Sequence, residues 1–337
     1  MEIQHNYPLQ PLQTFGLKVM ARSFASFDSP ESLQALLQTI PATDEKMILG
    51  GGSNLLFTKD YNGWILHNKV PGIKKIREDD DDVYVEAGAG ENWHELVQYC
   101  IQQGWAGLEN LSLIPGCVGA SPMQNIGAYG VELKDIFHSL EAYHIASGKL
   151  DHFDAAACRF GYRESIFKQE LKGQYVICRV TFRLQKNPVF HTGYGSIQEE
   201  LEKMGVTTIS IAAISDAVIR IRRSKLPDPK EIGNAGSFFK NPEIETSQFK
   251  DLKSLYSQLP GYVTIAGKTK VPAGWLIEQC GWKGYRKKDA GVHAKQALVL
   301  VNYGEATGKE IFNLSTEIME SVQEKFGIGL EREVNIV

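Results

Sequence analysis

The chain has 337 residues, of which 43% are hydrophobic and 23% charged, and its formal net charge at pH 7 is -4. This length predicts two or three domains with a substantial core, and the composition excludes disordered and fibrous proteins. General affinity for nucleic acids needs a concentrated basic surface, so we expect no nucleic-acid partner. A local basic patch for a small anionic ligand stays open.

The N-terminal stretch, residues 1–17, has neither a basic segment nor an apolar run, and no window of the chain reaches about 18 uncharged apolar residues. We therefore expect a cytoplasmic protein without a membrane partner. The five cysteines have no C-x-x-C spacing, and the eight histidines include no H-x-x-x-H pair. This pattern predicts reduced thiols and no metal site.

The first predicted elements lie before residue 70. Leucines recurring at helical spacing predict a helix over residues 29–40, with Ser29 as the N-cap and Pro30 at the first helical position. A short buried strand starting at Lys46 runs into the glycine turn GGGSN, and a second strand covers residues 63–69. We place the first domain boundary near residue 70.

The middle part of the chain runs from there to the prolines of LPDP, which mark a second boundary near residue 227. Its acidic run, residues 77–82, is expected to be a solvated hairpin loop. Residues 108–135 are rich in glycine, proline and small side chains, and a long loop inside a compact domain is usually functional. The remaining pattern predicts strands at 82–90, 140–153 (two strands joined by a Ser-Gly turn) and 175–184, and helices at 91–104 and 210–225.

The last part contains three predicted elements before the C-terminal stretch: helices at 272–281 and 308–326, and a strand at 297–302. The longer helix directs Ile311, Leu314, Ile318 and Val322 inward. Residues 329–337 are predicted to form a short strand that bears Glu331 and Glu333 and packs on the first domain.

Two glycine-rich segments are candidates for ligand binding. Gly50, Gly51 and Gly52 permit positive backbone angles and let main-chain N–H groups converge on an anion, and Ser53 and Asn54 add side-chain hydrogen bonds. The stretch IPGCVGASPMQNIGAYG, residues 114–130, allows close backbone approach to a large ligand and supplies many main-chain donors. Neither segment has the Rossmann or Walker register, and a tight turn or an ordinary loop is the alternative.

Polar residues elsewhere complete the set of candidates. Tyr162 and the Glu164–Ser165 pair flank Arg163, so its guanidinium is positioned for rigid binding of a carboxylate or of negative charge. The segment RRSKLPDPK is basic and suits phosphates. Ser237, in GNAGSFFKNP, does not meet the G-x-S-x-G pattern of a nucleophile. The alternative for each is an ordinary surface or turn residue.

Taken in order, these stretches resemble the UDP-N-acetylenolpyruvoylglucosamine reductases, the MurB-type flavoenzymes of peptidoglycan precursor synthesis. The TGYG segment resembles the larger subtype, which has an additional tyrosine loop. The resemblance implies an α+β, three-domain flavoenzyme with a vanillyl-alcohol-oxidase type (PCMH-like) FAD-binding part and a C-terminal substrate-binding domain. The implied domains are 1–70 together with 327–337, 71–226, and 227–326. The motifs that carry the resemblance are TFGL, LGGGSNLLF, GLENLSLIPGCVGASPMQNIGAYGVELKD, CRFGYRESIFK, KLPDPK, GNAGSFFKNP, AGWLIEQCG, HAKQALVLVN and LEREV.

The resemblance also implies the chemistry and the residues. NADPH reduces noncovalently bound FAD, and the enolpyruvyl double bond of a UDP-sugar is then reduced by a monomeric enzyme. Ser237 is the implied proton donor, with Arg163 and Glu333 as the other catalytic residues. The implied substrate-binding residues are Tyr194, Lys225, Asn241 and Gln296. The implied FAD-binding residues are Gly50, Gly51, Gly52, Ser53, Asn54, Pro115, Gly116, Gly119, Ala120, Ser121, Asn125, Gly127, Ala128 and Arg222.

Two other readings stay open at this point. One is an oxidase of the same fold that acts on an alcohol or a lactone. Such enzymes often tether FAD through a histidine near the glycine cradle, and the two glycine-rich segments contain none. The other is a nonenzymatic flavin- or nucleotide-binding protein, which would need the cradle but not Ser237, Arg163 and Glu333.

Overall fold

The computed structural model describes residues 2–264 and 266–337 and separates into two compact units. Unit 1 comprises Met1–Tyr7, Ala21–Gly51 and Asn62–Ser224, and unit 2 comprises Pro8–Met20, Gly52–Tyr61 and Lys225–Val337. Helices and strands occur in both units, as the predicted α+β class requires. The chain leaves unit 1 at Ser224, close to the predicted boundary near residue 227. The finer division into three domains stays a prediction.

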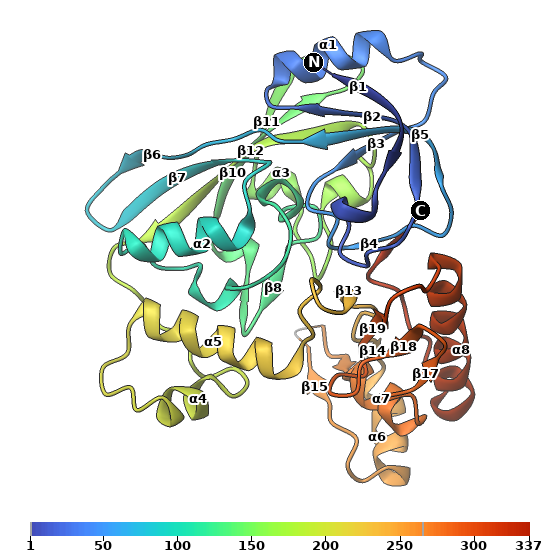
Figure 1. The fold of residues 1–337 in the computed structure, drawn as a ribbon. Coiled ribbons are helices and arrows are strands. Elements are labelled where there is room, and N and C mark those ends of the chain that lie inside the picture. The colour runs from blue at the N-terminus through green and yellow to red at the C-terminus, as the bar shows by residue number, and fades with distance from the viewer. Residues whose placement is uncertain (1, 265) are drawn as a thin grey trace. The chain divides into compact units, whose positions relative to one another are not determined.

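The first sheet of unit 1 has four strands in the order β1-β2-β5-β3 (Figure 1). The strands are β1 (Ile3–Pro8), β2 (Met20–Phe27), β3 (Lys46–Leu49) and β5 (Tyr61–Asn68). Helix α1 (Pro30–Thr39) buries Leu33 and Leu36 in a cluster with Trp64 and Leu66 of β5. The Ser29 side chain accepts from the Ser32 amide, so the predicted helix and N-cap are confirmed.

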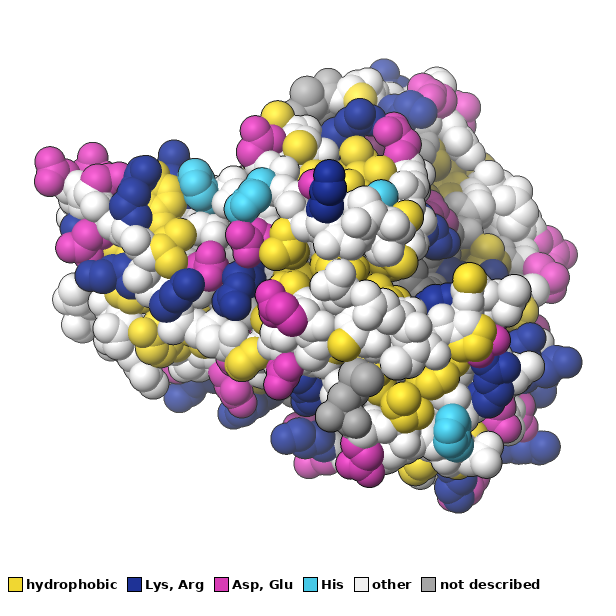
Figure 2. Space-filling view, turned by 90° about the horizontal axis from the view of Figure 1, so that it is seen from above, with side chains coloured by type: hydrophobic (Ala, Val, Ile, Leu, Met, Phe, Trp, Pro, Cys, Tyr) yellow, Lys and Arg dark blue, Asp and Glu magenta, His cyan; other side chains and the backbone are white. Residues whose placement is uncertain are grey.

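The second sheet of unit 1 is antiparallel throughout, with the order β11-β10-β12-β7-β6. The strands are β6 (Ile73–Glu78), β7 (Asp82–Gly88), β10 (Phe137–His144), β11 (Leu150–Asp154) and β12 (Tyr175–Gln185). The acidic run forms the exposed turn between β6 and β7, which confirms the predicted hairpin. Acidic side chains gather at the left edge of Figure 2, and elsewhere on that face charges of both signs are interspersed.

The remaining elements of unit 1 are short, apart from the helices α2 (Trp93–Gln102) and α5 (Ile211–Lys225). Helix α2 buries Trp93, Leu96, Val97 and Cys100 beside the second sheet. Helices α4 (Ile197–Lys203) and α5 share a small apolar cluster of their own. The stretch predicted as one long loop is built from the 3-10 turns η2 (Glu109–Leu111), η3 (Val118–Ala120) and η4 (Leu133–Asp135) and the hairpin β8 (Gly127–Ala128) and β9 (Val131–Glu132). Two further short elements are α3 (Ala155–Cys158) and η5 (Ile166–Lys168).

The described residues of unit 2 form three small sheets and three α-helices. The first sheet has the order β13-β19-β18-β17, the second has the order β14-β16-β15, and the third pairs β20 with β4. Helix α8 (Gly308–Phe326) has the predicted bounds, because Thr307 and Glu310 form a capping box at its start and Gly327 ends it with φ 64°. The other elements are η1 (Gln10–Leu12), β4 (Leu55–Leu56), β13 (Gly233–Ser237), β14 (Glu243–Ile244), α6 (Thr246–Leu255), β15 (Tyr262–Val263), β16 (Thr269–Lys270), α7 (Ala273–Gln279), β17 (Arg286–Lys287), β18 (Ala290–Val292), β19 (Val299–Asn302) and β20 (Asn335–Ile336).

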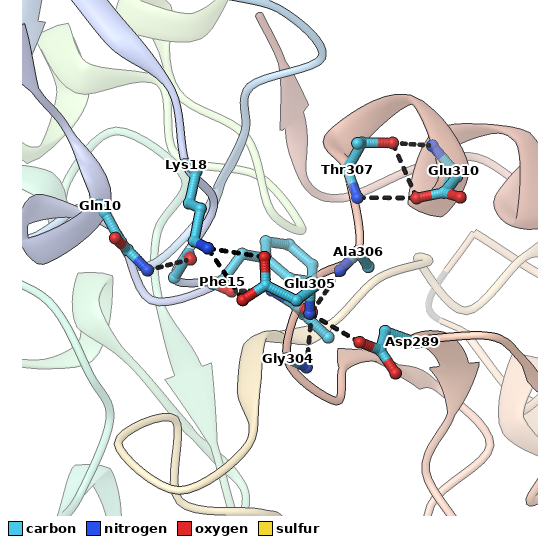
Figure 3. Close-up of polar contacts among 11 residues, drawn as sticks. Gln10, Phe15, Lys18, Asp289, Gly304, Glu305, Ala306, Thr307 and Glu310 are labelled. Atoms are coloured by element: carbon cyan, nitrogen blue, oxygen red, sulfur yellow. Dashed lines mark hydrogen bonds and ion pairs between the residues drawn. The ribbon is translucent and has the colours of Figure 1, made fainter.

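Two N-terminal segments belong to unit 2 because they bond to its C-terminal part. The Asn302 side chain donates to Phe15 O at 3.0 Å, and the amide of Asn234 donates to Thr14 O at 3.0 Å. Lys18 pairs with Glu305 on the surface beside these bonds (Figure 3). The pairing of residues this far apart in the chain was not visible in the sequence, so no boundary was expected on either side of residues 8–20.

The C-terminal strand is shorter than predicted. Regular pairing is limited to β20, which lies parallel to β4, and both strands belong to unit 2. Glu331 and Glu333 precede β20, so the prediction that the strand bears them is wrong. The backbone around these two residues is paired through an isolated bridge between Arg332 and Phe239. This bridge is separated from β20, so the segment forms no continuous strand.

Candidate active site

The two glycine-rich segments of the sequence meet in unit 1. A Cβ atom on Gly50 would overlap the Cys117 sulfur, and one on Gly51 would lie 2.7 Å from Gly116 Cα. Carbon atoms in contact are normally about 3.5–4.0 Å apart, so a side chain at either position requires the backbones to separate. The glycines therefore allow the end of β3 and the η3 segment to pack directly against each other.

The η3 segment is a rigid turn whose amides are already used. The amides of Gly119, Ala120 and Ser121 donate to the carbonyls of Ala89, Cys117 and Val118. The Ser121 hydroxyl also donates to Val118 O at 2.7 Å. The sequence suggested many main-chain donors here, and at these three positions the N–H groups serve the fold instead. A Cβ on Gly119 would lie 2.5 Å from Ala89 Cβ, so this glycine is required for packing.

Asn125 connects this segment to the turn that carries Arg163. It is buried, with φ 44°, and its side chain donates to Gly161 O at 2.9 Å and accepts from the Lys134 amide at 3.0 Å. Asparagine tolerates the left-handed region better than most residues, which explains its presence in this turn. Gly127 and Ala128 follow as β8, and Pro115 and Gly116 precede η3.

Arg163 is fixed by its backbone and by its side chain. Its φ is 57°, its Nη2 donates to Gly127 O at 2.9 Å, and its Cζ lies 5.8 Å from the centre of the Tyr162 ring. The predicted contact with Tyr162 is therefore present. The hydroxyl of Ser165 donates to Met123 O, so this serine holds the turn rather than the guanidinium.

Arg222, on α5, is a second guanidinium near Arg163. Burial lowers the pKa of Arg222 from its usual value, Tyr129 opposes this effect, and the nearby Arg163 adds to it. Within the described residues, Arg222 Nε is buried and has no hydrogen-bond partner. Two nearby cations in a partly buried place favour binding of an anion.

Tyr194 lies on an exposed loop that touches the β8–β9 turn. Its side chain is 61% exposed, and a Cβ on Gly130 would lie 3.0 Å from Tyr194 Cβ. Asn110 ties the two segments together, because its buried amide donates to Tyr129 O at 2.9 Å and to His191 O at 2.8 Å. The sequence analysis missed Asn110, and the only signal it offered was a polar residue between Glu109 and Leu111 in an otherwise small-residue stretch.

Ser237 lies at the end of β13 in unit 2. Gly236 has φ 69°, and its amide donates to the Asn234 side chain, which shapes an irregularity in the pairing with β19. Ser237 is exposed, whereas Phe238 and Phe239 are 0% and 1% exposed. The two phenylalanines therefore anchor the strand in the core, and the serine is presented at its surface.

Glu333 is held beside this strand. Its amide donates to Phe238 O at 2.8 Å, and the Lys240 amide donates to Glu331 O at 2.9 Å. The Asn54 side chain donates to Glu333 O at 3.2 Å. The structure thus brings Asn54 of the GGGSN segment, the Ser237 strand and the C-terminal segment together within unit 2. Gly52 and Ser53 belong to the same unit, and a Cβ on Gly52 would overlap Leu12 O.

The substrate-binding candidates of unit 2 include two that gather at the start of α7. The Asn241 side chain accepts from the Ala273 amide at 2.9 Å. Gln296 Oε1 lies 3.1 Å from the position of a Cβ on Gly274. Lys225 is the exposed last residue of α5. Arg163, Arg222 and Tyr194 belong to unit 1, so the candidate residues are divided between the units.

Metal sites, membrane-spanning helices and disulfides can be assessed in the described part of the chain. Residues 2–264 and 266–337 contain no group of three or more His, Cys, Asp or Glu side chains placed to hold a metal ion. None of the helices in those ranges is long and apolar enough to cross a membrane. All five cysteines are free, and burial raises the pKa of Cys100 to about 12 and that of Cys178 to about 11.

Comparisons with known proteins identify the family of the chain. Residues 21–154 match the family described as FAD binding domain, and residues 228–337 match UDP-N-acetylenolpyruvoylglucosamine reductase, C-terminal domain. UDP-N-acetylenolpyruvoylglucosamine reductases from Amoebophilus asiaticus and Flavobacterium johnsoniae are 53% and 50% identical to the chain, and each alignment covers 100% of both proteins. The crystal structure of UDP-N-acetylenolpyruvylglucosamine reductase from Thermus caldophilus, 24% identical, superposes with a TM-score of 0.68 over 99% of this chain and 98% of its own, and supports the fold. The chain therefore belongs to the UDP-N-acetylenolpyruvoylglucosamine reductase family.

Proposed function

We propose that the protein reduces the enolpyruvyl double bond of UDP-N-acetylglucosamine enolpyruvate to give UDP-N-acetylmuramate, with NADPH as the hydride donor and FAD as the cofactor. This reaction belongs to peptidoglycan precursor synthesis. The observation that carries the proposal is the 53% identity to a named reductase over the full length of both chains.

Unit 1 suits FAD on grounds of its own geometry. Gly50 and Gly51 pack directly on residues 116–117, so the two glycine-rich segments lie side by side and can contribute to one ligand site. Arg222, with a buried Nε that lacks a partner in the described part of the chain, supplies a cation for a phosphate. We assign the cofactor to these residues and to the others of the predicted FAD set. Bound FAD would carry a hydride from NADPH to the methylene carbon of the substrate.

Arg163 stabilises the negative charge that develops on the substrate. Addition of hydride to the methylene carbon places an electron pair on the neighbouring carbon and, by delocalisation, on the carboxylate. A guanidinium already fixed by Gly127 O and the Tyr162 ring can meet this charge without reorganising. Its contribution is therefore larger in the transition state than in the ground state.

Ser237 and Glu333 complete the reduction. We assign to the Ser237 hydroxyl the transfer of a proton to the carbon that carries the carboxylate, which balances the hydride and yields the saturated product. The proton is restored to Ser237 from water or through Lys225. Glu333, when it carries a proton, donates a hydrogen bond to the carboxylate of the substrate, and its backbone bond to Phe238 O keeps it beside the serine strand.

The remaining predicted residues bind the nucleotide sugar. We assign this role to Tyr194, Lys225, Asn241 and Gln296, with Tyr194 on a loop that closes over the substrate. We also propose that the enzyme acts in the cytoplasm as a monomer and has no nucleic-acid or membrane partner.

The test is identification of the product. The purified holoenzyme is incubated with NADPH and UDP-N-acetylglucosamine enolpyruvate, and the UDP-sugar is analysed by mass spectrometry. The proposal predicts a product heavier by two hydrogens, with deuterium at the carbon that carries the carboxylate when the solvent is deuterated. Consumption of NADPH without change in the sugar would contradict it.

A further inference from the structure

The segment that carries Glu333 is clamped to α8 by the side chain of Arg332. The guanidinium donates from Nε to Ser315 Oγ at 2.7 Å and from Nη2 to Thr316 Oγ1 at 2.6 Å. Its Cζ lies 4.4 Å from the centre of the Phe312 ring. Two directed hydrogen bonds and a ring contact leave a planar guanidinium with one orientation. The function proposed above gives Arg332 no role.

These contacts fix the orientation of Arg332 more than they stabilise the fold. Burial lowers the pKa of Arg332 from its usual value, so the fold bears part of the cost of desolvating a cation. Its hydrogen-bond acceptors on α8, Ser315 and Thr316, are neutral hydroxyls, which return less electrostatic energy than a carboxylate would. A smaller apolar side chain could cover Phe312 without this cost. The specific gain from arginine is a fixed direction.

The backbone of Arg332 is also the centre of the pairing between the C-terminal segment and the Ser237 strand. Its bridge partner is Phe239. On one side the Glu333 amide donates to Phe238 O, and on the other the Lys240 amide donates to Glu331 O. One residue therefore has its side chain locked to α8 and its main chain locked beside the residues that follow Ser237.

We infer that Arg332 is a positioning residue for the proton-transfer step, because it fixes the register between Glu333 and Ser237. The inference rests on the proposed function, which gives those two residues their roles. Arg332 acts through Glu333, since its guanidinium is directed to α8. A misplacement of about 1 Å at reacting groups can cost about a hundredfold in rate, so loss of the clamp affects the chemistry of the substrate and not the binding of FAD.

The first experiment compares the two half-reactions of the holoenzyme in Arg332→Met and Arg332→Lys. Under anaerobic conditions, bleaching of the flavin absorbance by NADPH is followed first, and recovery on addition of UDP-N-acetylglucosamine enolpyruvate second. We expect bleaching to stay within about threefold of wild type and recovery to slow by about a hundredfold in Arg332→Met. Arg332→Lys should recover part of this loss, because an ammonium can reach one hydroxyl but lacks the planar fork.

Arg286→Met is the matched control. Arg286 also lies in unit 2, over the Tyr303 ring at 4.3 Å, and donates to Lys288 O and Asp289, but it belongs to β17. Its loss also removes two hydrogen bonds and a ring contact, and both half-reactions should stay unchanged. Recovery as fast in Arg332→Met as in wild type, or slowed equally in Arg286→Met, would overturn the inference. If wild type itself did not recover, the proposed function would fail instead.

The second experiment needs neither FAD nor substrate. Hydrogen exchange is measured on the apoprotein in peptides that cover residues 329–337. We expect faster exchange of this segment in Arg332→Met and wild-type exchange in Arg286→Met. If Arg332→Met does not fold, Ser315→Ala combined with Thr316→Val removes both acceptors and keeps the arginine. Unchanged exchange in this double variant, with unchanged recovery of the flavin absorbance, would also overturn the inference.

Discussion

A single methyl group at Gly51 tests whether the glycine packing in unit 1 is required for FAD binding. In Gly51→Ala the added Cβ would lie 2.7 Å from Gly116 Cα, 3.0 Å from Gly116 C and 3.2 Å from Cys117 N. All three atoms belong to the backbone, so rotation of a side chain cannot relieve the overlap. To reach the ordinary contact distance of about 3.7 Å, the two segments must separate by about 1 Å.

Overlaps of this kind cost about 1–3 kcal/mol in well-packed proteins. If the strain appears only in the FAD-bound protein, the whole cost weakens FAD binding. The affinity for FAD then falls by about 5- to 150-fold, since each 1.4 kcal/mol is about a factor of ten. If the apoprotein is strained as well, part of the cost appears as a lower melting temperature, by about 3 °C for 2 kcal/mol in a chain of 337 residues. The structure predicts the total free-energy cost, which is divided between weaker FAD binding and lower stability of the apoprotein.

The assay measures FAD affinity by quenching of flavin fluorescence and stability of the apoprotein by thermal unfolding. Gly193→Ala is the control, because no atom lies within 4 Å of a Cβ at that position. Affinity and melting temperature in Gly51→Ala that both match those of Gly193→Ala would refute the packing argument. The result would mean that the segments separate freely and that the glycine serves no close approach.

Three further predictions concern Ser237, Tyr194 and His94. Ser237→Ala should slow recovery of the flavin absorbance by the enolpyruvyl sugar by about a hundred- to ten-thousand-fold while NADPH bleaching persists, and equal recovery in stopped-flow traces would remove Ser237 from the proton-donor role. Tyr194→Phe should raise the substrate KM more than it lowers kcat, and steady-state kinetics with the reverse pattern would exclude a binding role. His94 Nδ1 accepts from the amide of Leu113, whose φ is 59°, and burial, followed by Arg223 and Arg222, lowers the pKa of His94. As the pH falls, His94 therefore becomes protonated in the unfolded chain before it does in the folded chain. The free energy of unfolding should fall as the pH drops below about 6.5 and level off below the lowered pKa. Thermal unfolding of His94→Gln, which keeps a hydrogen-bond acceptor, should lack this part of the pH dependence.

Elements with strong local signals could be predicted from the sequence. The capping box at Thr307 and Glu310 and the glycine at 327 define α8 by short-range chemistry, and its inward residues Ile311, Leu314, Ile318 and Val322 are buried as expected. The Ser29 cap and the β6–β7 hairpin were visible for the same reason. Helix α6, with only Leu252 buried, has a weaker pattern and was not predicted.

The features that could not be predicted depend on contacts between distant parts of the chain. The bonds from Asn302 to Phe15 and from Asn234 to Thr14 place an N-terminal segment in unit 2, and no local pattern encodes them. The same holds for Glu333, whose neighbours are set by the bridge from Arg332 to Phe239 and not by a strand of its own. The amides of residues 119–121 looked available in the sequence because the turn that uses them appears only when η3 forms.

The most direct test of the proposed function is sequential anaerobic mixing of the holoenzyme with NADPH and then with UDP-N-acetylglucosamine enolpyruvate, while the flavin absorbance is recorded. The account predicts bleaching by NADPH and prompt recovery on addition of the enolpyruvyl sugar. Recovery that required oxygen and did not respond to the sugar would contradict it.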